Sequence, residues 1–115
     1  MPARRSAEVF ARMSAETPQR FATIDVGTNS VLLLVAEARD GGFVPVVERA
    51  EITRLGRGVD RSGVLSEQSI HDTLTVLGAF ADEARSLGVK EIACTATSAA
   101  RDARNGPDFM ARAQA

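Results

Sequence analysis

The sequence has little of what several classes of protein need. One of its 115 residues is cysteine, Cys94, so no disulfide can form within the chain, and a reducing cytoplasm is the expected location. One residue is histidine, His71, which excludes a zinc site built on several histidines. Tryptophan and tyrosine are absent, so apart from phenylalanine no side chain offers an aromatic platform for the bases of single-stranded nucleic acid.

Net charge and long apolar runs are missing as well. The 14 basic and 15 acidic residues give a formal charge of −1, so neither DNA nor an anionic membrane is an expected partner. An anion must therefore be bound by local geometry. The longest apolar run, residues 31–36, is far shorter than the roughly 20 residues that span a bilayer. No Gly-Lys-Ser/Thr element occurs, which excludes a P-loop nucleotide site.

Periodicity and turn signals predict one α/β domain after a polar, flexible extension at residues 1–20. Strands are expected at residues 21–26, 31–38, 43–52 and 90–95, with an Asp-Gly-Gly hairpin turn at residues 40–42. A glycine-rich loop is expected at residues 53–63, a long helix between the N-cap Ser66 and Gly88, and short helices at residues 98–104 and 107–113. The order is β-β-β-α-β-α-α.

This order has a consequence for what covers the sheet. The first two strands are apolar at nearly every position, which predicts a sheet covered on both faces. One long helix covers one face only, and Phe109 and Met110 have no later element to bury them. We therefore expect the chain to be the first part of a larger unit. A free edge at the fourth strand would favour a dimer or other association.

The turn between the first two strands carries polar groups that a simple turn does not need. Gly27 lets the backbone approach a ligand and adopt positive φ, and the following amides and side chains can donate to an anion. Asp25 would repel a bare phosphate but would hold a divalent cation beside one. These six residues equally fit a plain hairpin turn with Asn29 in a left-handed conformation and Asp25 capping it. Taken alone, they leave both interpretations open.

Four stretches together resemble the exopolyphosphatase and guanosine pentaphosphate phosphohydrolase (Ppx/GppA) family. They are IDVGTNSVLLLVAE (residues 24–37), TRLGRGV (53–59), GVLSEQSI (63–70) and CTATSAARDARNGPDF (94–109). The resemblance implies an actin-like (ribonuclease H-like) fold within the actin, hexokinase and Hsp70 superfold. Residues 21–115 would be the incomplete first domain. An actin-like sugar kinase or an Hsp70-type ATPase fits less well, because those proteins usually lack the Asn29-Ser30 pair.

The resemblance also implies an activity and a set of site residues. The family releases terminal phosphate from polyphosphate, or the 5′-γ-phosphate from guanosine pentaphosphate, with Mg²⁺. Asp25 would hold the metal directly or through water, and the phosphate would be bound by Gly27, Thr28, Asn29, Ser30 and Arg101. A helix capped by Thr97 or Ser98 would place Arg101 in its first turn, beside a helix N-terminus that favours anions. Further candidates for the same channel are Arg54, Arg57, Thr97 and Ser98, although solvated surface charge explains the two arginines equally well.

The resemblance places two further parts of the active site beyond Ala115, the last residue of the chain. They are the glutamate that acts as general base and a second glycine-rich phosphate loop. We therefore expect the chain alone to be a catalytically inactive fragment of a phosphohydrolase. The alternative is a non-catalytic module that binds phosphate or a guanosine alarmone, or a lobe completed by a partner. Cys94, within an apolar strand and without a neighbouring base, is expected to pack in the core.

Overall fold

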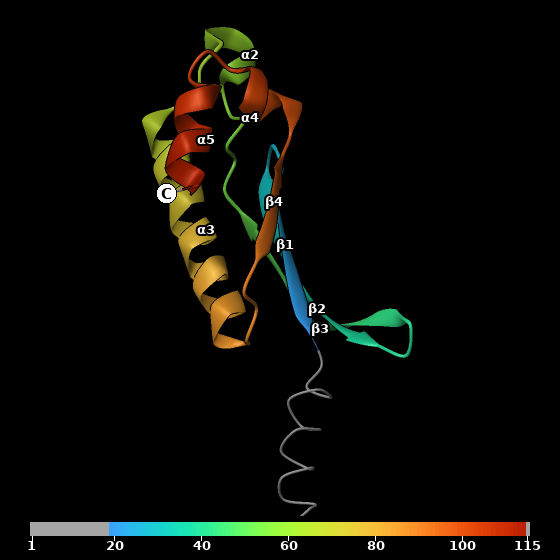
Figure 1. Cartoon of the computed structure of the whole chain (residues 1–115). Coiled ribbons are helices and arrows are strands. Elements are labelled where there is room, and N and C mark those ends of the chain that lie inside the picture. The colour runs from blue at the N-terminus through green and yellow to red at the C-terminus, as the bar shows by residue number, and fades with distance from the viewer. Residues whose placement is uncertain (1–18, 115) are drawn as a thin grey trace, which may run out of the picture.

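The computed structural model describes residues 19–114, so Ala115 and almost all of the predicted extension at residues 1–20 lie outside the described residues. Four strands form one sheet in the order β3-β2-β1-β4: β1 (Arg20–Val26), β2 (Ser30–Arg39), β3 (Gly42–Ile52) and β4 (Ile92–Ala96). The helices are α2 (Val59–Ser62), α3 (Glu67–Ser86), α4 (Ser98–Asp102) and α5 (Gly106–Gln114) (Figure 1). The predicted α/β order is confirmed, and α2 is an extra short helix within the loop expected at residues 53–63.

Local chemistry explains the elements that the sequence predicted best. The turn between β2 and β3 has Asp40 at φ 46° and Gly41 at φ 80°, as a two-residue hairpin with two positive φ angles requires. The Ser66 side chain accepts a hydrogen bond from the Ser69 N–H at 3.1 Å and so caps α3. At the other end of α3, Gly88 takes φ 87°, the left-handed conformation that commonly ends a helix.

The pairing of the strands sets which positions meet. β1 pairs antiparallel with β2 and parallel with β4, so β1 and β4 end at the same edge of the sheet. In this register Asp25 lies beside Thr95 on β4 and beside Leu32 on β2. β4 is an edge strand, as predicted, since no other described strand pairs with its outer side.

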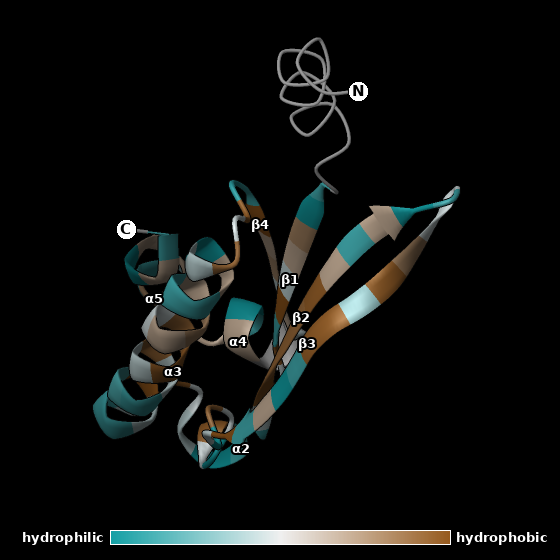
Figure 2. Ribbon diagram, turned by 90° about the horizontal axis from the view of Figure 1, so that it is seen from below, coloured by the Kyte–Doolittle hydropathy of each residue, from teal (hydrophilic) through white to brown (hydrophobic). Residues whose placement is uncertain are grey.

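The core lies between one face of the sheet and the helices α3 and α5. Figures 1 and 2 both show these two helices on the same side of the sheet. Every second residue of β1 and β2 points into this core, and α3 adds a stripe at helical spacing; the strand and helix residues are Ala22, Ile24, Val26, Val31, Leu33, Val35, Ile70, Leu77, Phe80 and Ala84. Phe109 on α5 is completely buried. The expectation that Phe109 would lack a covering element is therefore wrong, because α5 folds back against α3.

The other face of the sheet is open in the described part of the chain. Phe21 and Leu32 are each 45% exposed there, and Leu34 is 36% exposed. A shallow groove of about 580 Å³ runs over this face, lined by residues of β1, β2 and β3 that include Asp25, Leu32 and Glu48. The sequence predicted cover on both faces, and within residues 19–114 the helices supply it on one.

An ion-pair cluster lies at the end of the sheet away from Asp25, which we call the closed end. Glu37 is 4% exposed, and its carboxylate accepts hydrogen bonds from the guanidinium groups of Arg20, at 3.1 Å, and Arg39. Arg20 also donates to the carbonyl of Leu87, just after α3, at 3.0 Å. The cluster thereby joins β1 and β2 to the end of α3. Within the described residues, no helix combines the length and the apolar character needed to cross a membrane.

Candidate phosphate-binding site

Asp25 lies near the carboxyl end of β1, on the open face of the sheet. Its side chain is exposed, and its Oδ1 accepts a hydrogen bond from the Thr95 hydroxyl at 2.9 Å. The carboxylate is thus held in place by a neutral donor and keeps acceptor capacity for a ligand or a cation. Sequence reasoning missed Thr95, because its role depends on the parallel register of β1 and β4, which no local pattern reveals.

The turn at residues 27–30 differs from both conformations that the sequence suggested. The Gly27 N–H donates to the carbonyl of Ser30 at 2.8 Å, and none of residues 27–30 has a positive φ. The expectation of positive φ at Gly27 is therefore wrong, and so is the left-handed Asn29 of the plain-turn alternative. Gly27 is needed for space instead, since a Cβ atom there would lie 3.0 Å from the Ser30 carbonyl oxygen.

The donors of this turn are partly free. Thr28 and Asn29 are exposed, and within the described part of the chain their N–H groups donate to no backbone carbonyl. Their carbonyl groups, by contrast, are both taken by the loop that follows β3. In the described residues the turn thus keeps two N–H donors without a protein partner, while its carbonyl acceptors are bonded to the loop. This polarity suits an anion.

The loop after β3 lies directly on the turn. The N–H groups of Thr53 and Arg54 both donate to the carbonyl of Asn29, at 2.9 and 3.0 Å, and the N–H of Gly56 donates to the carbonyl of Thr28 at 2.9 Å. Arg54 has φ 52°, an unusual conformation for a residue with a side chain. The loop thus brings an arginine backbone against the candidate phosphate turn.

Both arginines of this loop have side chains available for a ligand. Arg54 and Arg57 are exposed, and among the described residues neither guanidinium makes a hydrogen bond or a salt bridge. Their assignment to the phosphate channel stays a prediction. Their loop, however, contacts the turn that carries the other candidates.

Helix α4 begins where β1 ends. The N–H of Thr97 donates to the carbonyl of Val26 at 3.0 Å, which ties the start of α4 to the residue after Asp25. Thr97 occupies the N-cap position but its side chain makes no capping bond, and its hydroxyl is buried without a partner in the described structure. Ser98 is the first residue of α4, and its side chain lies outside the described part.

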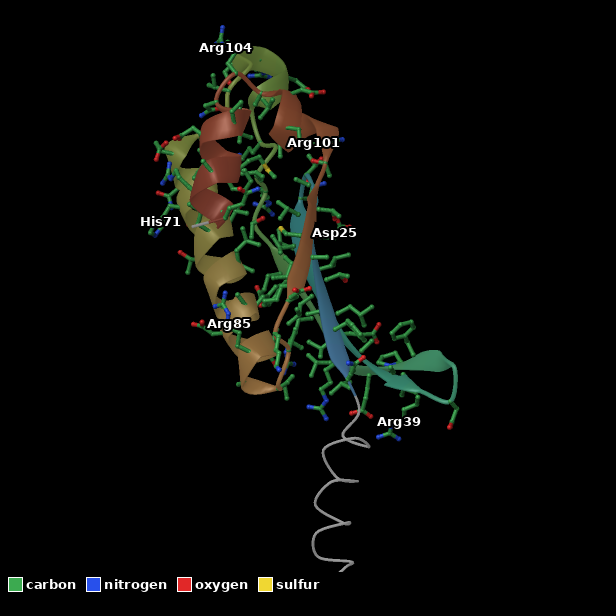
Figure 3. The ribbon with its side chains drawn as sticks, viewed as in Figure 1. Asp25, Arg39, His71, Arg85, Arg101 and Arg104 are labelled. Atoms are coloured by element: carbon green, nitrogen blue, oxygen red, sulfur yellow. The ribbon has the colours of Figure 1, made fainter. Side chains whose placement is uncertain are left out.

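Arg101 is the fourth residue of the five-residue helix α4, in which the first and last turns overlap. Its Nε lies 3.5 Å from the carbonyl of Thr97, and its guanidinium is exposed. Figure 3 shows Arg101 at the end of the molecule where β4 terminates, closer in this view to Asp25 than to Arg39 or Arg85. The structure thus brings Asp25, the 27–30 turn, the 53–58 loop and α4 to one edge of the sheet.

A clamp between two loops supports this edge. The side-chain amide of Asn105 accepts from the Leu65 N–H and donates to the Leu65 carbonyl, both at 2.8 Å. Arg104 donates from its backbone to the carbonyl of Gly63, at 2.8 Å, and from its guanidinium to the carbonyl of Ser62. In the sequence, Asn105 only follows the helix expected at residues 98–104. Its pairing with Leu65, forty residues away, is a tertiary contact.

Asp25 is a residue at this end of the sheet that could hold a divalent cation, and a magnesium ion there stays a prediction. No group of three or more histidine, cysteine, aspartate or glutamate side chains comes together within residues 19–114. Mg²⁺ is commonly held by one or two carboxylates, with phosphate and water oxygens completing the octahedron. Asp25, exposed and bonded to one neutral hydroxyl, matches that donor set.

The general base and the second glycine-rich phosphate loop are the two parts of the predicted site that were expected outside residues 19–114. The resemblance places both of them beyond Ala115, and Ala115 itself lies outside the described residues. Both therefore stay predictions. The candidates that the structure does describe, at positions 25, 27–30, 54, 57, 97 and 101, are groups that would bind or position a ligand.

Cys94 is exposed on the edge strand β4, so the expectation of core packing is wrong. A strand that forms the sheet edge leaves even an apolar-looking position partly open to solvent. Partial burial and the negative charge of Asp25 both raise the pKa of the Cys94 thiol, which keeps it in the unreactive protonated form.

Taken together, the fold and this edge define an actin-like α/β domain with candidate anion donors at the carboxyl ends of its central strands. The model of the Ppx/GppA phosphatase family matches residues 34–115, and the chain belongs to that family. The match begins after the 27–30 turn, so it includes Arg54, Arg57 and Arg101 but not Asp25 or the turn itself.

Individual relatives agree with the family match. Exopolyphosphatase 1 of Mycobacterium tuberculosis is 36% identical over 94 residues, covering 81% of this chain and 27% of the relative. A guanosine-5′-triphosphate,3′-diphosphate pyrophosphatase of Pseudoalteromonas translucida is 32% identical, covering 84% of this chain and 20% of the relative. The crystal structure of the Aquifex aeolicus Ppx/GppA family member superposes with a TM-score of 0.81 at 35% identity, over 84% of this chain and 32% of that one. The chain therefore spans about a third or less of these relatives.

Proposed function

We propose that this chain supplies one wall of the active site of a phosphohydrolase that removes terminal phosphate from polyphosphate or the 5′-γ-phosphate from guanosine pentaphosphate. The observation that carries the proposal is the exposed Asp25 carboxylate beside the free N–H donors of Thr28 and Asn29. The names of the relatives, an exopolyphosphatase and a guanosine-5′-triphosphate,3′-diphosphate pyrophosphatase, support the two substrates.

Each candidate residue has a defined part in this proposal. The N–H groups and side chains at residues 27–30 would donate to the phosphate, and Arg101 would pair with its charge. Asp25 would hold Mg²⁺, which neutralises phosphate charge when bound. Arg54 and Arg57 would extend the positive surface along a longer polyanion, since their guanidinium groups have no other partner in the described residues.

We propose in addition that the 115 residues alone bind phosphate without turning it over. The candidate groups all lie at one end of a single sheet, where β1 and β4 finish. Phosphoryl transfer needs charge stabilisation and alignment from several sides. Such a chain acts either as part of a larger enzyme or as a binding module completed by a partner. The free edge of β4 would be the contact for association with a second copy or another chain.

The test is titration calorimetry of the 115-residue chain with inorganic tripolyphosphate in the presence and absence of Mg²⁺. We expect binding that is stronger with Mg²⁺, and that loses its Mg²⁺ dependence in Asp25→Asn. Asp82→Asn is the matched control, since this exposed residue lies near the far end of α3. Absence of binding by the wild-type chain, or equal effects of the two substitutions, would contradict the proposed site.

A phosphate-release assay on long-chain polyphosphate separates the two roles of the chain. Binding without release supports the proposal that the chain supplies one wall only. Sustained turnover by the 115 residues alone would overturn it. Light scattering during size-exclusion chromatography tests the proposed association, and a monomer at all concentrations would contradict it.

A further inference from the structure

We infer that Gly56 is a positioning residue: its lack of a side chain leaves room for the Thr28 methyl group and so lets the Thr28 hydroxyl keep the orientation needed to bind phosphate. Gly56 has no direct access to the ligand in this interpretation and acts through its neighbour. The inference rests on the proposed function, because it assigns a partner to one donor of the same site. Two independent features of the structure point to it.

The first feature is a hydrogen bond that fixes the distance between the two loops. The Gly56 N–H donates to the Thr28 carbonyl at 2.9 Å, and two further bonds from residues 53 and 54 hold the neighbouring Asn29 carbonyl. These backbone bonds tie residues 53–56 of the glycine-rich loop to positions 28 and 29 of the turn. The backbone of position 56 cannot retreat from Thr28 without breaking its own bond.

The second feature is the space between the loops. A Cβ atom on Gly56 would overlap the Thr28 methyl carbon Cγ2, and would also lie 3.4 Å from the Thr28 carbonyl oxygen. Gly56 is not among the glycines with positive φ, so its backbone conformation is open to any residue. Glycine is required here because of the Thr28 methyl group and not because of the chain's own dihedral angles.

A Cβ atom added at position 56 would displace the Thr28 side chain. Thr28 is exposed, so its side chain can rotate about χ1 to escape an added Cβ atom. That rotation relieves the overlap at little cost in stability, and it moves the hydroxyl away from its present position. A substitution at position 56 should therefore weaken anion binding while leaving the fold intact.

The experiment is a double-mutant cycle on the 115-residue chain, with inorganic tripolyphosphate and Mg²⁺ as the probe. Gly56→Ala should raise the Kd by roughly tenfold, the size expected for one lost hydrogen bond to a charged oxygen. Thr28→Ser removes the methyl group and keeps the hydroxyl, so the double variant Gly56→Ala/Thr28→Ser should bind as Thr28→Ser does. Gly78→Ala is the matched control, because a Cβ atom there meets nothing within 4 Å.

Two readouts keep the inference separate from the proposed function. The melting temperature of Gly56→Ala should stay close to that of the wild type, and NMR coupling constants should report a changed χ1 at Thr28 that is absent in the control. If the wild type does not bind tripolyphosphate, the proposed function fails, and the χ1 measurement alone decides the role of Gly56. An unchanged χ1, or a binding loss that Thr28→Ser does not rescue, would overturn the inference.

Discussion

Two carboxylates on neighbouring strands of the same sheet have opposite surroundings. Glu37 is 4% exposed and its two oxygens are both taken by arginines, one of which also ties β1 to the end of α3. Asp25 is exposed and one of its oxygens accepts from a neutral hydroxyl. The difference separates a carboxylate that has used its bonding capacity inside the protein from one that still has acceptor capacity left.

The arginines divide in the same way. Arg20 and Arg39 lie at the closed end of the sheet and are paired with Glu37. At the opposite end, which carries Asp25 and which we call the open end, Arg101 bonds weakly to the carbonyl of Thr97. The guanidinium groups of Arg54 and Arg57 have no partner within the described structure. A polyanion would meet positive charge that the protein has not already neutralised. The closed end serves stability, and the open end is suited to binding.

The largest expected effects come from removing the charge of each carboxylate in turn. Glu37→Gln removes the nearly buried charge to which Arg20 and Arg39 both bond, so we expect the largest fall in melting temperature among these variants and unchanged anion binding. Asp25→Asn should change the free energy of unfolding by no more than about 0.5 kcal/mol, as is usual for an exposed residue, and should abolish Mg²⁺-dependent binding. Thermal melts measure the stability of both variants, and calorimetry measures their anion binding. If either variant lost both stability and binding, the separation of the two roles would be contradicted.

A smaller effect is expected in the pH dependence of the stability that the Glu37 cluster contributes. Burial acts to raise the pKa of Glu37, but the hydrogen bonds and charges of Arg20 and Arg39 outweigh it and hold that pKa below its usual value of 4.5. The cluster therefore contributes stability that is fully present above that value and is lost as the pH falls through the lower folded value. Urea unfolding from neutral pH down to acid pH should show the stability gap between wild type and Glu37→Gln closing as the carboxylate is protonated. A gap that stays constant would show that the charge of Glu37 is not responsible.

The smallest expected effect concerns Cys94, which serves as a local reporter of the charge on Asp25. Partial burial raises the pKa of this thiol, and the negative charge of Asp25 raises it further. Asp25→Asn should lower the pKa and speed the reaction with a disulfide reagent at about pH 8, a few-fold at most, because the thiolate is the reacting form. The rate measured against pH checks this, with Glu37→Gln as the control. Equal rates in all three proteins would mean that Asp25 does not act on Cys94.

Local sequence patterns predicted most of the fold. The Asp40-Gly41 turn, the Ser66 cap and the Gly88 helix end depend on the chemistry of adjacent residues, and all three are confirmed. The burial of Phe109 was missed because it depends on α5 folding back against α3. The exposure of Cys94 was missed because a strand's apolar pattern does not reveal that it forms the sheet edge.

In the candidate site, the sequence singled out residues whose conformations it did not predict. Asp25 and residues 27–30 were singled out by their unusual polarity, whereas the hydroxyl of Thr95 and the clamp formed by Asn105 with Leu65 were not. The helix that carries Arg101 was predicted over residues 98–104, but α4 has five residues and ends at Asp102. These differences all involve partners distant in the chain or the exact length of a short element.

The sequence by itself determined the order of strands and helices, the hairpin turn and the position of the polar turn after β1, because each follows from periodicity and from the dihedral preferences of neighbouring residues. The tertiary structure decided which hydrogen-bonding groups of that turn are occupied and which remain free. Hydrogen bonds from residues 53–56 occupy the carbonyl groups of Thr28 and Asn29, and the close approach of Gly56 leaves no space for a side chain. Such contacts join residues far apart in the chain, where only the packing of the whole sheet sets the distance.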